Sequence, residues 1–191
     1  MCAAFQRRRA GDIAPPSSRT SGRDSSCGKC LEGAAGDGEG GALHLDDLKT
    51  RANDFDPMTR DRFLANTLIP AAWVVQAQRV RHWFARRVAR VFETVDVLIA
   101  PATPCTAPTI GTEWLEINGQ RLPARASMGL LTQPVSCIGL PVCTVTVWGA
   151  HPTLPLGVQL IAAPWREDLA LRVAAELESQ GLCSAPVAQG L

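Results

Sequence analysis

Three stretches in the carboxyl-terminal half of the chain decide its expected fold: VDVLIAPATPCTAP (residues 95–108), TQPVSCIGLPVCTVTV (132–147) and LPLGVQLIAAP (154–164). Residues 95–100 and 157–161 are short, mainly apolar runs, which predict strands buried on both faces. Residues 142–147 end in alternating threonine and valine, which predicts a strand with two unlike faces. The sequence therefore predicts three strands in this half of the chain.

A helix is expected to begin at Asp56-Pro57. Aspartate accepts hydrogen bonds at a helix N-cap, and proline suits the first helical position. Pro70 should break or kink this helix. Three of its apolar side chains are predicted to point inward: Phe63, Leu64 and Leu68.

Two further helices are expected, over residues 71–94 and 166–180. In the first, apolar residues recur at spacings of three and four and predict one buried stripe: Val80, Trp83, Phe84, Val88 and Val91. In the second, Glu167 and Asp168 suit the positive end, and Gly181 suits a left-handed stop.

The expected order of elements along the chain is helix, helix, strand, long loop, strand, strand, helix. This order is typical of an α/β fold. Residues 101–126 are expected to be a loop in which Asn118-Gly119 marks a turn between two short strands. Residues 126–138 are expected to form a helix or loop that Pro134 interrupts. Three strands make a poor independent sheet, and strands buried on both faces need covering layers.

Length and composition limit the function classes. The chain has 191 residues, which suits one domain, and a formal net charge of +1, which gives no global field for nucleic acid or an anionic membrane. It has no apolar run of about 18 residues and no apolar stretch after its first arginines, so neither a spanning helix nor a secretory signal is expected. Seven irregularly spaced cysteines then indicate reduced thiols in a cytoplasmic protein.

Residues 1–42 are rich in Gly, Ser, Pro and Arg and are expected to be a disordered or non-native leader. The folded region is expected to span residues 43–185, followed by a frayed tail at 186–191. Cys27 and Cys30 form a CxxC that suits half a zinc site or a redox pair, but no second pair of ligands follows it in the leader. No metal and no cofactor are therefore expected.

The residues of the folded part do not assemble a catalytic unit. Their serines lack a Gly-x-Ser-x-Gly turn, and no lysine follows Lys49 to serve as a base. The three histidines lie far apart in the sequence. The adjacent acids Asp46 and Asp47 suit a solvated helix start, and the arginines of residues 79–90 suit either phosphate contacts or a solvated helix face.

Three blocks in the same order resemble the amidase-signature family over about residues 43–185: DVLIAPATP (96–104), TQPVSCIGLPVCTV (132–145) and LPLGVQLIAAPWREDLALRVA (154–174). Within the family, FDPMTRDRFL (55–64) and APWREDLALRVA (163–174) are most similar to the amidase-type large subunits of biuret and carboxybiuret hydrolases. The similarity to the A subunit of glutamyl-tRNA amidotransferases is more distant.

The resemblance implies an α/β fold, here an incomplete part of the amidase-signature mixed sheet flanked by helices, with a disordered amino-terminal arm. It also implies hydrolysis of a carboxamide or urea-like C–N bond by a serine nucleophile, a second serine on a cis peptide and a lysine base. The motifs that carry these groups are not present in this chain. No catalytic residue is assigned, and the chain alone is expected to be inactive.

By the same resemblance, this region supplies a wall of the substrate site. Four substrate-binding candidates lie in segments that follow or precede core strands: Thr103, Thr132, Gln133 and Ser136. Hydrogen bonds within the proline-rich turns are the alternative for each, and Gly139, Gly157 and Gln159 are expected to be structural.

The complete enzyme is expected to act on a small amide or urea-like substrate, with a small partner subunit or a homo-oligomer and without nucleic acid or membrane. The alternative function is a non-catalytic subunit or interaction protein derived from an amidase fold.

Overall fold

A computed structural model describes residues 3–5, 39–149, 151 and 153–186 of the chain. The chain divides into two compact units, one of residues 15–86 and one of residues 1–14 and 87–191. Most of the predicted leader, including Cys27 and Cys30, lies outside the described residues, as does most of the predicted tail. Within the leader, Ala3–Phe5 forms strand β1 and residues 39–42 are helical.

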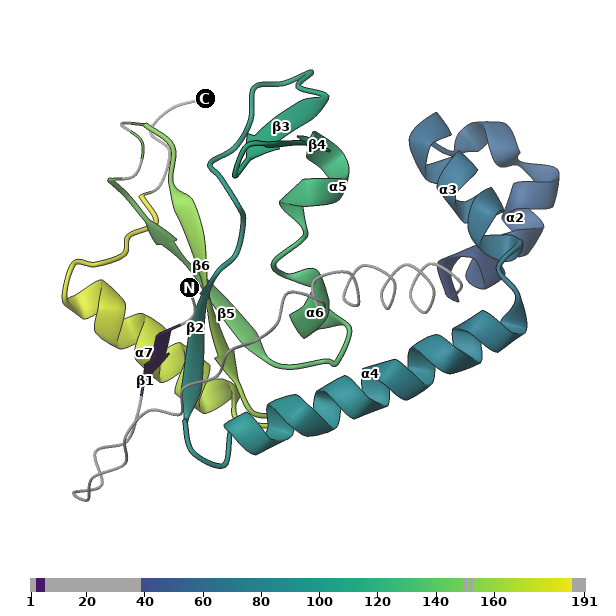
Figure 1. Ribbon diagram of the computed structural model, residues 1–191. Coiled ribbons are helices and arrows are strands. Elements are labelled where there is room, and N and C mark those ends of the chain that lie inside the picture. The colour runs from purple at the N-terminus through teal and green to yellow at the C-terminus, as the bar shows by residue number, and fades with distance from the viewer. Residues whose placement is uncertain (1–2, 6–38, 150, 152, 187–191) are drawn as a thin grey trace. The chain divides into compact units, whose positions relative to one another are not determined.

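The larger unit is built on an antiparallel sheet of four strands in the order β1-β2-β6-β5 (Figure 1). Strand β6 (Leu156–Ala162) lies between β2 (Val97–Pro101) and β5 (Val142–Val147), and β1 pairs with the other edge of β2. The burial expected for residues 157–161 is confirmed for 159–161, whereas Gly157 and Val158 are half-buried. All pairings among the described strands are antiparallel, so any parallel strand of a mixed sheet lies outside them.

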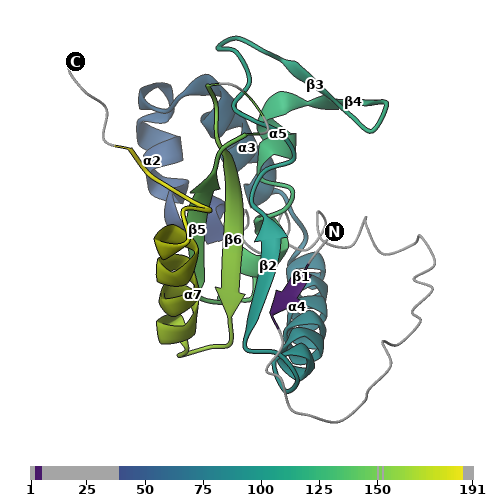
Figure 2. The same ribbon diagram turned by 90° about the vertical axis from the view of Figure 1, so that its left-hand side faces the viewer.

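Helix α7 (Glu167–Ser179) packs against β5, β6 and β2 (Figure 2). It ends as predicted, because Gly181 has a φ of 69° and the Leu182 N–H donates to the Leu177 carbonyl at 2.9 Å. The chain then returns to the edge of β5, where the Ser184 carbonyl accepts from the Thr146 hydroxyl at 2.8 Å. This part of the predicted folded region is therefore an α/β layer.

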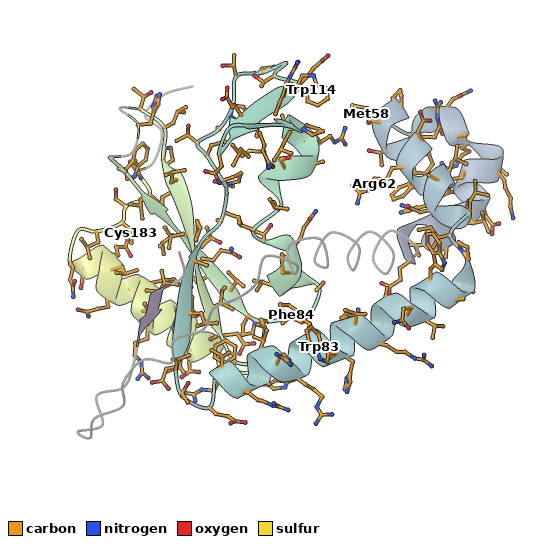
Figure 3. All side chains as sticks on the ribbon, in the orientation of Figure 1. Met58, Arg62, Trp83, Phe84, Trp114 and Cys183 are labelled. Atoms are coloured by element: carbon orange, nitrogen blue, oxygen red, sulfur yellow. The ribbon has the colours of Figure 1, made fainter. Side chains whose placement is uncertain are left out.

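The predicted hairpin is confirmed in the long segment after β2. Strands β3 (Trp114–Ile117) and β4 (Gln120–Pro123) form a separate two-stranded sheet. Asn118 and Gly119 join them with φ values of 52° and 73°, the positive pair that a tight hairpin turn requires. The Arg121 guanidinium lies 4.7 Å from the centroid of the Trp114 ring, which is labelled in Figure 3.

Two short helices, α5 (Ala124–Met128) and α6 (Gln133–Ser136), follow the hairpin. The predicted interruption at Pro134 is wrong in position: the helical run is broken at residues 129–132, and Pro134 lies in the first turn of α6. Proline is compatible with a first turn because its missing N–H would have no helical partner there.

The smaller unit is helical. It contains α2 (Leu45–Thr50), the 3₁₀ turn η1 (Ala52–Asp54), α3 (Pro57–Thr67) and most of α4 (Ala71–Val91). The predicted N-cap is confirmed, since the Thr59 N–H donates to the Asp56 carboxylate at 3.1 Å. The ring of His44 stacks on Phe63 at 5.2 Å, and Phe55 lies edge-on to both rings.

The apolar faces of α3 and α4 are much less buried than the periodicity predicted. Leu68 is 82% exposed and Leu64 43%, and Ala77 is the one buried residue of α4. Trp83, labelled in Figure 3, is 50% exposed. Periodicity identifies which side chains share a face, but burial needs a covering layer. The described residues leave these positions incompletely covered.

Candidate functional site

The two segments predicted to form a substrate wall meet in the larger unit at the side chain of Gln159. This side chain is 2% exposed on β6. Its Nε2 donates to the Pro101 carbonyl at 2.9 Å and to the Leu131 carbonyl at 3.3 Å. Pro101 is the last residue of β2 and Leu131 immediately precedes Thr132, so one amide joins the turn after β2 to the segment before α6.

Three contacts hold the turn after β2, two of them to its surroundings and one within the turn. The Ala102 N–H donates to the Gly157 carbonyl at 2.8 Å. The Thr103 hydroxyl donates to the Cys105 carbonyl at 2.8 Å, within the turn itself. The Cys105 thiol approaches the Met128 sulfur at 3.8 Å, which links the turn to the end of α5.

The segment before α6 is a tight helical turn. The Thr132 hydroxyl donates to the Gly129 carbonyl at 3.1 Å, and the Gln133 N–H donates to the same carbonyl at 3.0 Å. Gln133 is half-buried at the start of α6, whereas Ser136 is exposed at its end. The hydroxyls of Thr103 and Thr132 thus make the local turn bonds that were the alternative to substrate contact.

Thr103, Thr132 and Gln133 lie in the two segments that the hydrogen bonds of Gln159 join. Ser136 lies one helical turn further along the chain. Substrate contact by these four residues stays a prediction. The glycine expectations are confirmed: a Cβ at Gly157 would meet the Ala102 Cβ at 3.0 Å, and Gly139 has a φ of 68°.

Two polar side chains near this site are buried: Gln159, which was expected to be structural, and Ser127, whose burial was not predicted. Gln159 is a lone amide in an apolar strand, and a buried amide must find hydrogen-bond partners. That signal was available in the sequence. Ser127, on α5, is 1% exposed, and its hydroxyl has no hydrogen-bond partner among the residues that the structure describes. No feature of the sequence around Ser127 indicates its burial.

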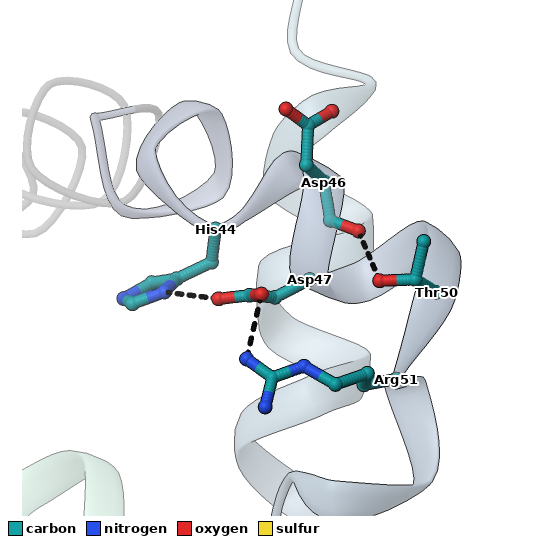
Figure 4. Close-up of polar contacts among 5 residues, drawn as sticks. All are labelled: His44, Asp46, Asp47, Thr50 and Arg51. Atoms are coloured by element: carbon teal, nitrogen blue, oxygen red, sulfur yellow. Dashed lines mark hydrogen bonds and ion pairs between the residues drawn. The ribbon is translucent and has the colours of Figure 1, made fainter.

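The adjacent acids of α2 form an ion-pair cluster (Figure 4). The Arg51 guanidinium donates to the Asp47 carboxylate at 2.7 Å and holds the pKa of Asp47 below its ordinary value. His44 Nδ1 lies 4.0 Å from the same carboxylate, and the Asp46 carbonyl accepts from the Thr50 hydroxyl. Asp47 is therefore a half-buried, ionised partner of Arg51 rather than a proton donor at neutral pH.

The described part of the chain shows neither a metal-binding cluster nor a membrane-spanning helix. No group of three or more His, Cys, Asp or Glu side chains is placed there to hold a metal ion. No helix there combines the length and the apolar character needed to cross a membrane. The arginines of α4 are mostly exposed, as a solvated helix face requires.

Residues 37–171 match the sequence profile of the Amidase family. Since this match covers more than half of the chain, the protein belongs to the amidase-signature family, as the three sequence blocks predicted.

The expected relatives within the family are also confirmed. The chain is 53% identical over 145 residues to AtzE, a subunit of the 1-carboxybiuret hydrolase of Pseudomonas sp. (strain ADP), in an alignment that covers 75% of this chain and 32% of the relative. It is 33% identical over 153 residues to the A subunit of the glutamyl-tRNA(Gln) amidotransferase of Corynebacterium glutamicum (strain R), covering 74% of this chain and 29% of the relative.

Solved structures share the fold. One solved relative belongs to a vestigial protein complex that reveals the evolutionary origins of an s-triazine catabolic enzyme. It matches with a TM-score of 0.81 and 48% identity, and the match covers 86% of this chain and 36% of that chain. An amidase crystal structure matches with a TM-score of 0.77 at 24% identity, which shows the fold alone. The predicted fold class is thus confirmed, and the chain spans about a third of the length of the relatives it matches.

Proposed function

We propose that this chain is the carboxyl-terminal scaffold of an amide hydrolase and forms one wall of its substrate site. The complete enzyme would cleave a carboxamide or urea-like C–N bond. The observation that carries this proposal is the 53% identity to a carboxybiuret hydrolase subunit over three quarters of the chain. The joining of the two candidate wall segments by Gln159 supports it.

The groups that this chain contains indicate which parts of the complete site it supplies. Amide hydrolysis through an acyl-enzyme needs an activated nucleophile, a base and hydrogen-bond donors for the oxyanion. The chain has no lysine after Lys49 and no Gly-Gly-Ser-Ser-Gly motif, so the complete enzyme takes its nucleophile and base from other residues. The half-buried Gln133 offers an amide that can donate to and accept from a carboxamide, and the hydroxyl oxygens of Thr103 and Thr132, whose hydrogens are used within their turns, can accept.

A non-catalytic subunit derived from the amidase fold is the alternative. The solved relative is a protein complex, and exposed apolar side chains such as Leu68 and Trp165 are available for contact with a partner subunit or a second copy. On either reading we propose a cytoplasmic protein, with no metal or cofactor and no nucleic-acid or membrane partner.

A chimera tests the proposal. Residues 43–185 of this chain replace the matching third of the Pseudomonas protein, and hydrolysis of 1-carboxybiuret and of biuret is measured beside the unmodified relative. Turnover by the chimera, with none by the isolated chain, is the expected result. A chimera that folds like its parent but hydrolyses neither compound would contradict a substrate-wall role. Turnover by the isolated chain that one point substitution abolishes would contradict the assignment of nucleophile and base to other residues.

A further inference from the structure

Gln159 is placed where a buried polar side chain would ordinarily weaken the core. Its neighbours along β6 are apolar, and Leu160 is fully buried. In the sheet it lies opposite Ala100 on one side and Thr144 on the other. Burial of an unsatisfied amide is unfavourable, so its two hydrogen bonds decide whether this position is tolerable.

Both bonds leave from one nitrogen and end on segments that are about thirty residues apart in the sequence. Nε2 carries two hydrogens, and it donates to the carbonyls of Pro101 and Leu131. Few other side chains of this length can do the same without a charge. A methionine has no donor, and an ionised glutamate would place negative charge against two carbonyl oxygens.

We propose that Gln159 is a positioning residue: its amide fixes the spacing between the turn that carries Thr103 and the segment that carries Thr132 and Gln133. It acts through the backbone carbonyls of Pro101 and Leu131 and does not contact substrate. Where the two segments form a substrate wall, which rests on the proposed function, Gln159 sets the width of that wall.

The other hydrogen bonds of the two segments do not join them to each other as directly as those of Gln159. The hydroxyls of Thr103 and Thr132 are engaged within their own turns. The Ala102 N–H bonds to β6, which holds the first segment but not the second. The Cys105 thiol meets the sulfur of Met128 at 3.8 Å, and a thiol is a weak donor.

The test uses the full chain and follows hydrogen exchange of single amides by NMR. The reporters are the N–H groups of Gln133, Ser136 and Cys137, which are bonded to the carbonyls of Gly129, Thr132 and Gln133. The references are the amides of the β5–β6 pair. Gln159→Met keeps the length of the side chain and removes both donors, and Gln120→Met on the exposed hairpin is the matched control.

In Gln159→Met, exchange at the reporters should accelerate by about tenfold or more, while the β5–β6 references change much less. Gln120→Met should leave both sets unchanged. An equal acceleration at reporters and references would overturn the proposal, because it would mean that Gln159 serves only global stability. Unchanged reporters in Gln159→Met would overturn it as well.

A second variant guards against failure of Gln159→Met to fold. In Gln159→Glu the protonated acid can donate to one carbonyl, whereas the ionised acid cannot donate. The ratio of the exchange rate at the reporters to that at the references should therefore be lower at acidic pH than at neutral pH. In the native chain, scalar couplings from Gln159 Nε2 to the carbonyl carbons of Pro101 and Leu131 should be detectable, and absence of both would refute the tie. These outcomes do not depend on catalysis, so an inactive chimera would refute the proposed function while leaving this inference standing.

Discussion

Gly157 and Ala102 lie in such close contact that a side chain at Gly157 would require its neighbours to move. A Cβ added at Gly157 would meet the Ala102 Cβ at 3.0 Å and the Thr144 Cγ2 at 3.4 Å. Ala102 is buried, and its N–H is bonded to the Gly157 carbonyl, so it cannot retreat without losing that bond. The close approach holds the turn after β2 against the central strand.

Gly157→Ala should therefore lower the free energy of unfolding by about 1–3 kcal/mol, the usual cost of overpacking a core. Urea denaturation measures the change. Gly129→Ala is the matched control, because a Cβ there would lie 3.5 Å or more from its neighbours and the backbone φ is negative. A Gly157→Ala protein as stable as Gly129→Ala would show that the strand and the turn leave room for a methyl group at Gly157.

Two hydroxyls close to the candidate site should respond in opposite ways to removal. Thr103→Val keeps the shape of the side chain and deletes the 2.8 Å bond to the Cys105 carbonyl, so it should cost about 0.5–1.5 kcal/mol. Ser127→Ala deletes a buried hydroxyl that has no partner in the described part of the chain, so it should leave stability unchanged or raise it by up to about 1 kcal/mol. Thermal unfolding of the two variants beside the parent measures both effects. A marked loss of stability in Ser127→Ala would reveal a hydrogen bond that these residues do not supply.

The sequence predicted most of the elements of the fold because their signals are local. Asp56-Pro57 starts a helix, Asn118-Gly119 forms a hairpin turn and Gly181 ends a helix, each through the backbone preferences of its own residues. The burial of α3 and α4 was predicted wrongly because burial depends on what lies opposite. Leu68 has the right spacing for a core position and is nevertheless 82% exposed.

The candidate site was predictable only in part for the same reason. The family blocks located the turn at Thr103 and the segment at Thr132, but the tie between them depends on a side chain in a third block. Nothing in the local sequence tells which carbonyls Gln159 will meet, because Pro101 and Leu131 reach it through the pairing of β2 with β6 and the path of α5.

The start of α7 should show a small dependence of stability on pH. The Arg166 guanidinium donates to the Asp168 carboxylate at 3.0 Å, and this bond, more than the charge alone, holds the pKa of Asp168 below its ordinary value of 3.8. A carboxyl group whose pKa is lower in the folded state stabilises the fold above its unfolded pKa. That contribution is lost as the pH falls through the folded pKa.

Asp168→Asn should accordingly be less stable than the parent at neutral pH, and the difference should fade as the pH falls below 3.8. Both side chains of the pair are about half exposed, so the difference should be small and should shrink further in high salt. Urea midpoints at several pH values check the trend. A difference that persists unchanged at the most acidic pH would show that Asp168 acts through something other than its charge.

Trp165 combines a left-handed backbone with an uncovered side chain, just before α7. Its φ is 65°, a region that costs a bulky residue about 1 kcal/mol or more, and it is 89% exposed. Trp165→Gly should relieve this strain and raise the free energy of unfolding by up to about 1 kcal/mol, since little packing is lost. Trp165→Ala should not, because alanine keeps the Cβ that makes the conformation unfavourable. Comparison of the two variants by urea denaturation separates backbone strain from side-chain packing. If both lower stability equally, the indole ring makes a stabilising contact that its exposure conceals.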